Sequence, residues 1–275
     1  FWVARTDRIW GMVSERMKTG ADLPLLAVLG AGRSGTNLLA DVISEEPAFL
    51  NTVENRYVWN YRQMTFAHDV RHAEEATAPV ARFIQDFFSS HAARSGQIPV
   101  DKTPSNIFRI PFLMAVFPRA QILHVVRDGR ANIYSRLREW HGGNAVVARQ
   151  APDGAVERSG NYRSALFRRR VERVRDIMNS GSLPPSRIPA FLYDNMPTYL
   201  RQTLFGHLPR YGERFPGMAQ HLAAYGHIET AGAQWREGVM QAIRAGRPLG
   251  PERYLEIRYE DLLGQPDAAW ARIAA

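Results

Sequence analysis

Apolar residues recur along this chain in a strand–loop–helix order. Short, continuously apolar runs bounded by Pro, Gly or charged residues predict buried strands. Such runs lie at 24–30, 49–54, 98–104, 121–127 and 253–259. Apolar residues at helical spacing predict helices at 38–43, 78–93, 106–118, 128–140 and 264–275, with an amphipathic helix at 1–20. Because strand–helix–strand units make parallel strands, we expect an α/β, three-layer fold whose central parallel sheet is flanked by helices.

The pattern loosens between about 142 and 232, where prolines interrupt it. They are Pro184, Pro185, Pro189, Pro197, Pro209 and Pro216. We expect a single domain over 1–275 with a core at 21–141, an inserted cap of helices and loops at 142–232, and a return to the core at 233–275.

Composition narrows the chemistry. With no cysteine, the sequence excludes disulfides, thiolate catalysis and cysteine-bound zinc. The net charge is +8, almost all of it from arginine, since Lys18 and Lys102 are the only lysines. A basic protein favours anionic ligands such as phosphate, sulfate, acidic glycan or nucleic acid. No run approaches the length of a membrane span. The lack of cysteine leaves the compartment open, and we expect a cytoplasmic location. The sequence opens on Phe1, which leaves room for a preceding targeting segment.

A glycine-rich turn, Gly30–Gly35, follows the first predicted strand and fits two known phosphate-binding motifs. The spacing G-x-G-x-x-G is typical of dinucleotide folds, and Glu54 supplies the acidic residue that holds a ribose there. Against this, Arg33 crowds a pyrophosphate that should lie on bare backbone. The spacing G-x-x-x-x-G is typical of triphosphate loops, but Thr36-Asn37 replaces their Lys-[Ser/Thr] pair.

The missing lysine and metal-binding hydroxyl indicate an anion of lower charge, bound without a metal. Backbone N–H groups and a helix N-terminus remain to hold it. Arg33 and the hydroxyls of Ser34 and Thr36 add further donors.

The segment "GAGRSGTNLL" resembles the 5′-phosphosulfate loop of sulfotransferases that use 3′-phosphoadenosine 5′-phosphosulfate (PAPS). In that family a Lys or Arg before Ser-Gly-Thr contacts the donor. The resemblance implies donor contacts at Gly32, Arg33, Ser34, Gly35, Thr36 and Asn37. "QILHVVRDGRANIYSRL" resembles the family's 3′-phosphate site and implies contacts from Arg127 and Ser135. Arg127 also leaves the carboxyl end of a strand, where ligands bind in open α/β sheets, and a guanidinium–phosphate pair is a strong contact.

Within the family, "RSGT", the downstream Glu54, "VDKTP" and "RDGRA" look most like tyrosylprotein sulfotransferases and their bacterial relatives. The resemblance covers about 25–140 plus "RYEDLL" at 258–263, and more weakly "GERFPGM" and Trp235. It implies a P-loop-like fold in which 21–141 binds the nucleotide and the cap binds the acceptor.

The implied reaction is metal-independent, in-line transfer of a sulfuryl group to a hydroxyl of a carbohydrate, peptide tyrosine or small molecule. Glu54 is the expected general base, and Lys102 with Arg33 would stabilise charge on the transferring group. The competing interpretation of Glu54 is a surface residue or a partner of Arg56.

The sequence departs from the family pattern in three places. Asn37 replaces a more usual Thr or Ser. Arg136 and Arg138 are candidates for a further basic contact to the 3′-phosphate. The chain also stops before the family's C-terminal basic segment, which would close over that phosphate, so we expect weakened donor binding.

Several alternatives stay open. They are a P-loop-type nucleotide kinase, a Rossmann-type NAD(P)-dependent oxidoreductase, and a catalytically inactive nucleotide- or RNA-binding module. For the main interpretation we expect no nucleic-acid partner, and the sequence leaves the oligomeric state open.

Overall fold

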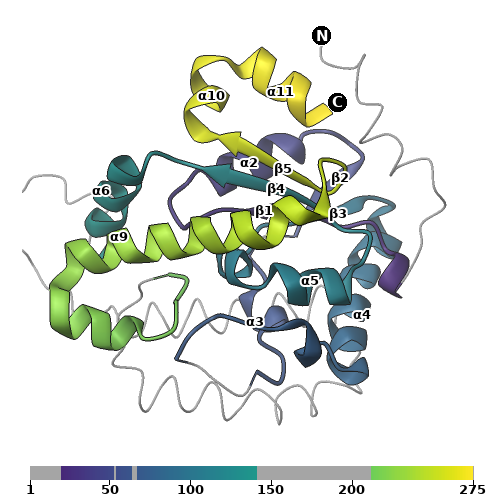
Figure 1. Cartoon of the computed structure of the whole chain (residues 1–275). Helices are drawn as coiled ribbons and strands as arrows, with labels where there is room; N and C mark the ends of the chain where they lie inside the picture. The colour runs from purple at the N-terminus through teal and green to yellow at the C-terminus, as the bar shows by residue number, and fades with distance from the viewer. Residues whose placement is uncertain (1–19, 53, 64–66, 141–211, 275) are drawn as a thin grey trace, which may run out of the picture.

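Five parallel strands form the centre of the computed structural model, which describes residues 20–52, 54–63, 67–140 and 212–274 (Figure 1). The strands are β1 (Leu26–Leu29), β2 (Phe49–Asn51), β3 (Ile98–Asp101), β4 (Gln121–Val126) and β5 (Tyr254–Arg258). Their order is β2-β3-β1-β4-β5, and every neighbouring pair is parallel. The predicted parallel sheet is confirmed.

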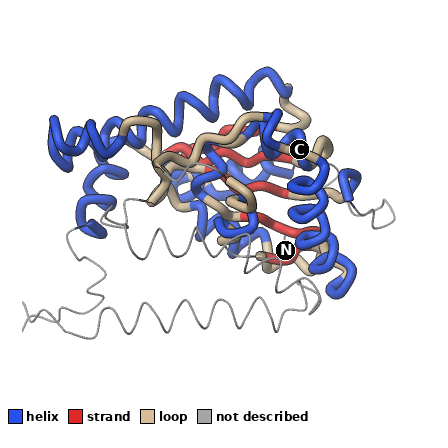
Figure 2. Tube along the Cα trace, turned by 90° about the horizontal axis from the view of Figure 1, so that it is seen from below, coloured by secondary structure: helices blue, strands red, loops and turns tan. Residues whose placement is uncertain are grey.

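Helices cover both faces of this sheet, because successive strand side chains point to opposite sides. On one face, Leu26 and Val28 pack with α2 (Thr36–Ile43), α10 (Tyr259–Gly264) and α11 (Pro266–Ala274). The other face packs against a larger group of helices, which are α4 (Ala78–Ser95), α5 (Ile110–Val116) and α9 (Met218–Gly246). Viewed from below, the strands lie between helices (Figure 2). The three-layer α/β fold is confirmed.

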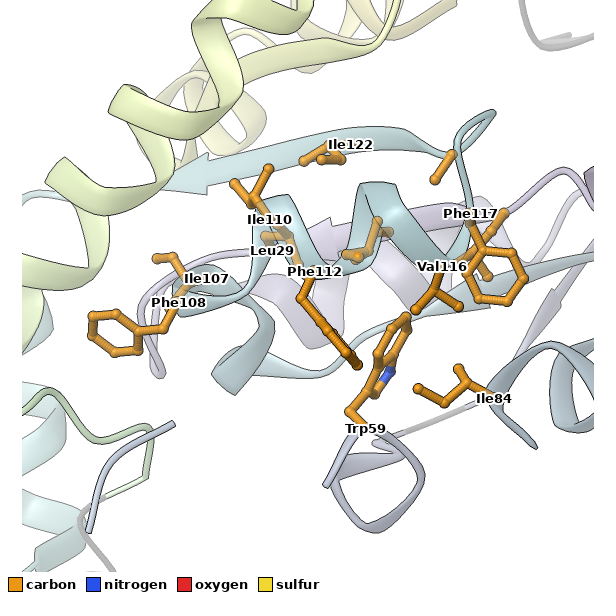
Figure 3. Packing of buried hydrophobic residues seen from close by; sticks show 14 of the residues in the cluster. Leu29, Trp59, Ile84, Ile107, Phe108, Ile110, Phe112, Val116, Phe117 and Ile122 are labelled. Carbon is orange, nitrogen blue, oxygen red and sulfur yellow. The ribbon is translucent and has the colours of Figure 1, made fainter. Parts of the chain in front are cut away.

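Trp59 anchors the segment that follows β2. It ends the short helix α3 (Arg56–Trp59), is fully buried, and lies among the rings of Phe88, Phe112 and Phe117 at centroid distances of 5.7, 6.3 and 6.2 Å. Figure 3 shows the indole packed between α5 and the neighbouring apolar side chains. Loss of a buried Trp side chain costs about 3–5 kcal/mol. This anchor therefore fixes the direction in which the chain leaves β2.

The single helix expected at 106–118 is wrong. The chain instead forms the 3-10 turn η3 (Pro104–Phe108) and then α5, with Arg109 between them. Pro111 lies in the first turn of α5. Proline lacks an N–H and clashes with the carbonyl four residues earlier, so it suits a helix start and not a helix interior.

The remaining predicted elements fall partly outside the described residues. The helix predicted at 1–20, apart from Gly20, and most of the cap predicted at 142–232 lie there. Three short helices complete the described part: η1 (Gly20–Asp22), η2 (Ala73–Glu75) and η5 (Arg247–Leu249). Helix α6 (Gly129–Trp140) follows β4, as predicted, and α9 runs across position 232, where the cap was expected to end.

Candidate active site

The predicted site residues lie at the carboxyl ends of four neighbouring strands. Parallel strands end at the same edge of a sheet, and ligands bind there in open α/β folds. The loop with Gly32 to Asn37 follows β1, and Arg127 follows β4. Glu54 follows β2, Lys102 follows β3, and Ser135 lies on α6. The sheet order thus brings together residues that are widely separated in the sequence.

The loop between β1 and α2 has two residues in the left-handed region. Arg33 has φ 73° and Gly35, which precedes α2, has φ 92°. A side chain at Gly35 would be strained, and its Cβ would also overlap the ring of Tyr259. Arg33 and Asn37 are exposed, whereas Thr36 is buried. The loop therefore presents a guanidinium and the first turn of a helix at the sheet edge.

Helix α6 holds this loop through Asn132. The Asn132 Nδ2 donates to the Gly32 carbonyl at 3.0 Å and to the Ser34 Oγ at 3.0 Å. The Ser34 side chain is fully buried, and its backbone N–H donates to the Ala31 carbonyl at 3.0 Å. Ser34 therefore shapes the loop from inside.

Three residues predicted to bind the donor touch one another. The Arg127 Nη1 donates to the Arg33 carbonyl at 2.9 Å, and the Arg33 Nε donates to the Ser135 Oγ at 3.2 Å. The Arg127 guanidinium also lies over the ring of Tyr259, 4.6 Å from its centroid. Trp235 donates from Nε1 to the Arg127 carbonyl at 3.1 Å. The segments predicted to bind the two ends of the donor are thus in direct contact.

Glu54 and Lys102 form an ion pair at the adjoining strand ends. The Lys102 Nζ and the Glu54 Oε2 are 3.9 Å apart, and the side chains are 12% and 38% exposed respectively. Arg56, the alternative partner of Glu54, forms an ion pair with Asp69 at 2.6 Å and is attracted to Glu54 more weakly. The structure therefore brings the two proposed reactive groups together and leaves Glu54 accessible.

A buried ion pair that the sequence analysis missed supports the loop. The Glu213 Oε1 accepts from the Gly32 N–H at 2.8 Å and from the Arg136 Nη2 at 2.7 Å. The same Arg136 nitrogen donates to the Gly32 carbonyl at 2.8 Å. Arg136 and Glu213 are 2% and 1% exposed. Arg136, one candidate for a phosphate contact, instead joins α6 to the loop.

Asp69 binds the segment that contains Glu213, residues 212–215. Its buried carboxylate accepts from Arg56, Arg109 and Arg214, with the shortest contact at 2.6 Å. Burial alone would raise the pKa of Asp69, but the three guanidinium groups outweigh it and hold that pKa well below its usual range. The Arg214 N–H also donates to the Asp69 Oδ2 at 2.7 Å. Asp69 therefore fixes the backbone next to Glu213.

Comparison with known proteins identifies the family. The profile of the family described as "Sulfotransferase family" matches residues 24–204 of this chain. The matched range includes all the site residues described above except the segment 212–215, Trp235 and Tyr259. The chain belongs to the sulfotransferase family.

Similarity to individual sulfotransferases is low. A protein-tyrosine sulfotransferase of Drosophila melanogaster is 24% identical over 127 residues, covering 42% of this chain and 25% of that protein. The match thus spans a quarter of the curated relative's length. A sulfotransferase domain from the curacin biosynthetic pathway has a TM-score of 0.47 and 14% identity, covering 92% of this chain and 73% of that one. The sulfotransferase domain of the Synechococcus PCC 7002 olefin synthase has a TM-score of 0.47 and 15% identity, covering 94% and 75%.

The described residues of this sulfotransferase-family chain lack two features. They contain no helix long and apolar enough to cross a membrane. Within the same ranges, no three His, Cys, Asp or Glu side chains are grouped so that they could hold a metal ion.

Proposed function

We propose that the chain transfers the sulfuryl group of PAPS to a hydroxyl group of an acceptor. The observation that carries this proposal is the contact between Arg33, Arg127 and Ser135, at 2.9 and 3.2 Å. PAPS carries a phosphosulfate on its 5′ side and a phosphate on its ribose 3′ oxygen. It needs two anion-binding surfaces close together, and these three residues supply them.

The loop after β1 is suited to the phosphosulfate. The first N–H groups of a helix have no acceptor within the helix, and the helix dipole adds partial positive charge, so the start of α2 favours an anion. Gly35, Thr36 and Asn37 would offer their backbone N–H groups, and Arg33 would add a full positive charge. Gly32 and Ser34 would keep the loop in shape, since both are bonded to α6.

The 3′-phosphate would lie between the end of β4 and α6. Arg127 can form charge-assisted hydrogen bonds to a phosphate, and the Ser135 hydroxyl can add a neutral one. The Trp235 N–H holds only the Arg127 backbone carbonyl, while the ring of Tyr259 lies against the Arg127 guanidinium. This support limits the side-chain entropy that Arg127 would lose on binding.

In the proposed reaction the acceptor oxygen bonds to sulfur as the bond from sulfur to the 5′-phosphate oxygen breaks. Adenosine 3′,5′-bisphosphate leaves, and Glu54 takes the acceptor proton. Lys102 and Arg33 stabilise the negative charge on the transferring group and the leaving oxygen. A sulfuryl group carries one negative charge, less than a terminal phosphoryl group, so these cations suffice where a triphosphate loop uses a lysine and Mg²⁺.

The sheet order argues against the dinucleotide alternative. In a dinucleotide-binding fold the strand that carries the ribose-binding acid pairs with the first strand. Here β3 lies between β1 and β2, so Glu54 is one strand further away and pairs with Lys102. Against the kinase alternative, the position of the phosphate-binding lysine is occupied by Thr36, a buried neutral residue.

A transfer assay tests the proposal. The chain is incubated with PAPS labelled in the sulfuryl group and with a tyrosine peptide, a glycan and a small phenol in separate reactions. We expect label in one acceptor class, with one adenosine 3′,5′-bisphosphate formed per transfer. Donor binding without transfer to any of the three classes would contradict the proposal and support the inactive-module alternative.

A further inference from the structure

Asp101 is a buried carboxylate that the proposed reaction does not use. It ends β3, directly before Lys102, and is fully buried. Its Oδ1 accepts from the Thr103 hydroxyl at 2.8 Å, and its Oδ2 accepts from the Asn106 Nδ2 at 2.9 Å. Among the described residues no cation forms an ion pair with it. A buried charge held only by neutral donors is costly, so its place beside the reactive groups calls for an explanation.

Thr103 connects this carboxylate to the segment that carries Glu54. The Thr103 Oγ1 accepts from the backbone N–H of Asn55 at 3.0 Å, while its hydroxyl hydrogen goes to Asp101. Asn55 in turn donates from Nδ2 to the carbonyl and the Oγ1 of Thr52, at 2.9 and 3.0 Å. The Thr52 Oγ1 donates to the Val100 carbonyl at 2.9 Å. The Thr52 backbone N–H donates to the same carbonyl at 3.0 Å, so three hydrogen bonds join the loop after β2 to the end of β3 and to Thr103.

These bonds fall on the immediate neighbours of both reactive groups. Asn55 follows Glu54, while Asp101 and Thr103 flank Lys102. Because these bonds hold the backbone next to Glu54 and Lys102, they set the positions from which the two side chains extend. The Glu54 Oε2 and the Lys102 Nζ lie 3.9 Å apart. The network therefore acts on the geometry of the pair and does not touch either side chain.

We propose that Thr103, oriented by the Asp101 carboxylate, is a positioning residue that sets Glu54 against Lys102 for the transfer step. This inference rests on the proposed function of that pair. The charged carboxylate is essential to the arrangement because it can only accept hydrogen bonds. It forces the Thr103 hydroxyl to donate toward Asp101 and leaves its lone pairs for the Asn55 N–H.

The protonation of Asp101 is compatible with this role near neutral pH. Burial raises the pKa of Asp101 to about 6, and hydrogen bonds from Thr103 and Asn106 oppose that rise. The carboxylate is therefore mostly ionised at pH 7.5.

Two variants of Thr103 test the proposal. Thr103→Val keeps the shape and removes the hydroxyl, while Thr103→Ser keeps the hydroxyl. Misplacement of reacting groups by about 1 Å can cost about a hundredfold in rate. We expect Thr103→Val to lower kcat by about ten- to a hundredfold, to leave the Kd of adenosine 3′,5′-bisphosphate within about twofold, and Thr103→Ser to restore kcat to within about threefold.

A crystal structure of the Thr103→Val variant gives a second test that does not depend on turnover. In a crystal structure of Thr103→Val we expect the separation between the Glu54 Oε2 and the Lys102 Nζ to exceed the 3.9 Å of the parent chain. Unchanged kcat in Thr103→Val, equal losses in the Val and Ser variants, or an unchanged pair in the crystal would each overturn the proposal. An inactive parent chain would instead contradict the proposed function, and the crystal comparison would still decide whether Thr103 positions the pair.

Discussion

Arg127 donates a hydrogen bond to the backbone carbonyl of Arg33 at 2.9 Å, across 94 positions of sequence. The Arg33 side chain continues the connection to Ser135 at 3.2 Å. The loop after β1 and the first turns of α6 therefore form one connected surface. We expect both ends of the donor to bind at this surface.

Replacing Arg127 should selectively weaken binding of the donor nucleotide. A hydrogen bond to a charged group contributes about 1.5–3 kcal/mol, so we expect Arg127→Ala to raise the Kd of adenosine 3′,5′-bisphosphate by about ten- to a hundredfold. Arg130→Ala is the matched control, because Arg130 is 93% exposed and paired with Asp128. Calorimetric titration of both variants checks this, and equal effects in the two would refute the assignment of Arg127.

Removing the proposed base should slow transfer without loss of donor binding. We expect Glu54→Gln to lower kcat by about a hundred- to ten-thousandfold, the usual contribution of general base catalysis. Lys102→Ala should show a similar loss of kcat, because charge on the transferring group is no longer stabilised. Glu45→Gln, at an exposed position near the end of α2, controls for loss of an acidic side chain. Near-normal turnover in Glu54→Gln would remove Glu54 as the base.

Breaking the Glu213–Arg136 pair should destabilise the fold. Glu213→Gln leaves the Arg136 guanidinium buried without its carboxylate at 2.7 Å. Loss of one partner of a buried pair costs about 3–5 kcal/mol. Urea unfolding measures this free energy, with Glu237→Gln as the control because Glu237 is 42% exposed in its ion pair. A change below about 1 kcal/mol, the range of surface pairs, would show that the buried pair is unimportant for stability.

His124 should make the free energy of unfolding fall in acid. Burial lowers the pKa of His124 from 6.5 to about 4, and its Nδ1 lies 2.6 Å from the Tyr254 hydroxyl. The folded state thus binds a proton less readily than the unfolded state. Stability from this group is complete above pH 6.5 and is lost as the pH falls toward 4, by an amount on the order of 3 kcal/mol.

The comparison with His124→Asn isolates this contribution, since other titrating groups are common to both chains. Urea unfolding at several pH values should show a smaller loss between pH 6.5 and 4 in the variant. Parallel curves for the two chains would contradict the assignment.

The parts of the fold that follow from local pattern were predictable. Apolar runs predicted each strand that the described residues form, and the glycine turn with Arg33 marked the loop before α2. Glu54 and Lys102 were predicted from the resemblance to sulfotransferases, and they meet in the structure because residues that end neighbouring parallel strands lie at one edge of the sheet. The break at Arg109 was missed because the apolar spacing continues past it, although Pro111 was a usable signal of a helix start.

Contacts between distant segments could not be predicted in the same way. Glu213 lies 181 positions from Gly32, and no periodicity links them. The segment "GERFPGM" resembles the sulfotransferases only weakly. A charged residue such as its Glu213 is usually exposed, so nothing in the sequence indicated that Glu213 would be buried against the loop after β1. Thr103 was likewise only part of a motif, and its role depends on the position of Asn55 on another strand end.

The most direct test of the central claim is calorimetric titration of the chain with adenosine 3′,5′-bisphosphate, its 2′,5′ isomer, ATP with Mg²⁺, and NADPH. The isomer has the same charge and tests whether the ribose phosphate is recognised by position. We predict that the 3′,5′ compound binds more tightly than each of the others by at least about tenfold, or about 1.4 kcal/mol. Equal or tighter binding of ATP with Mg²⁺ or of NADPH would contradict the assignment of a PAPS-dependent sulfotransferase.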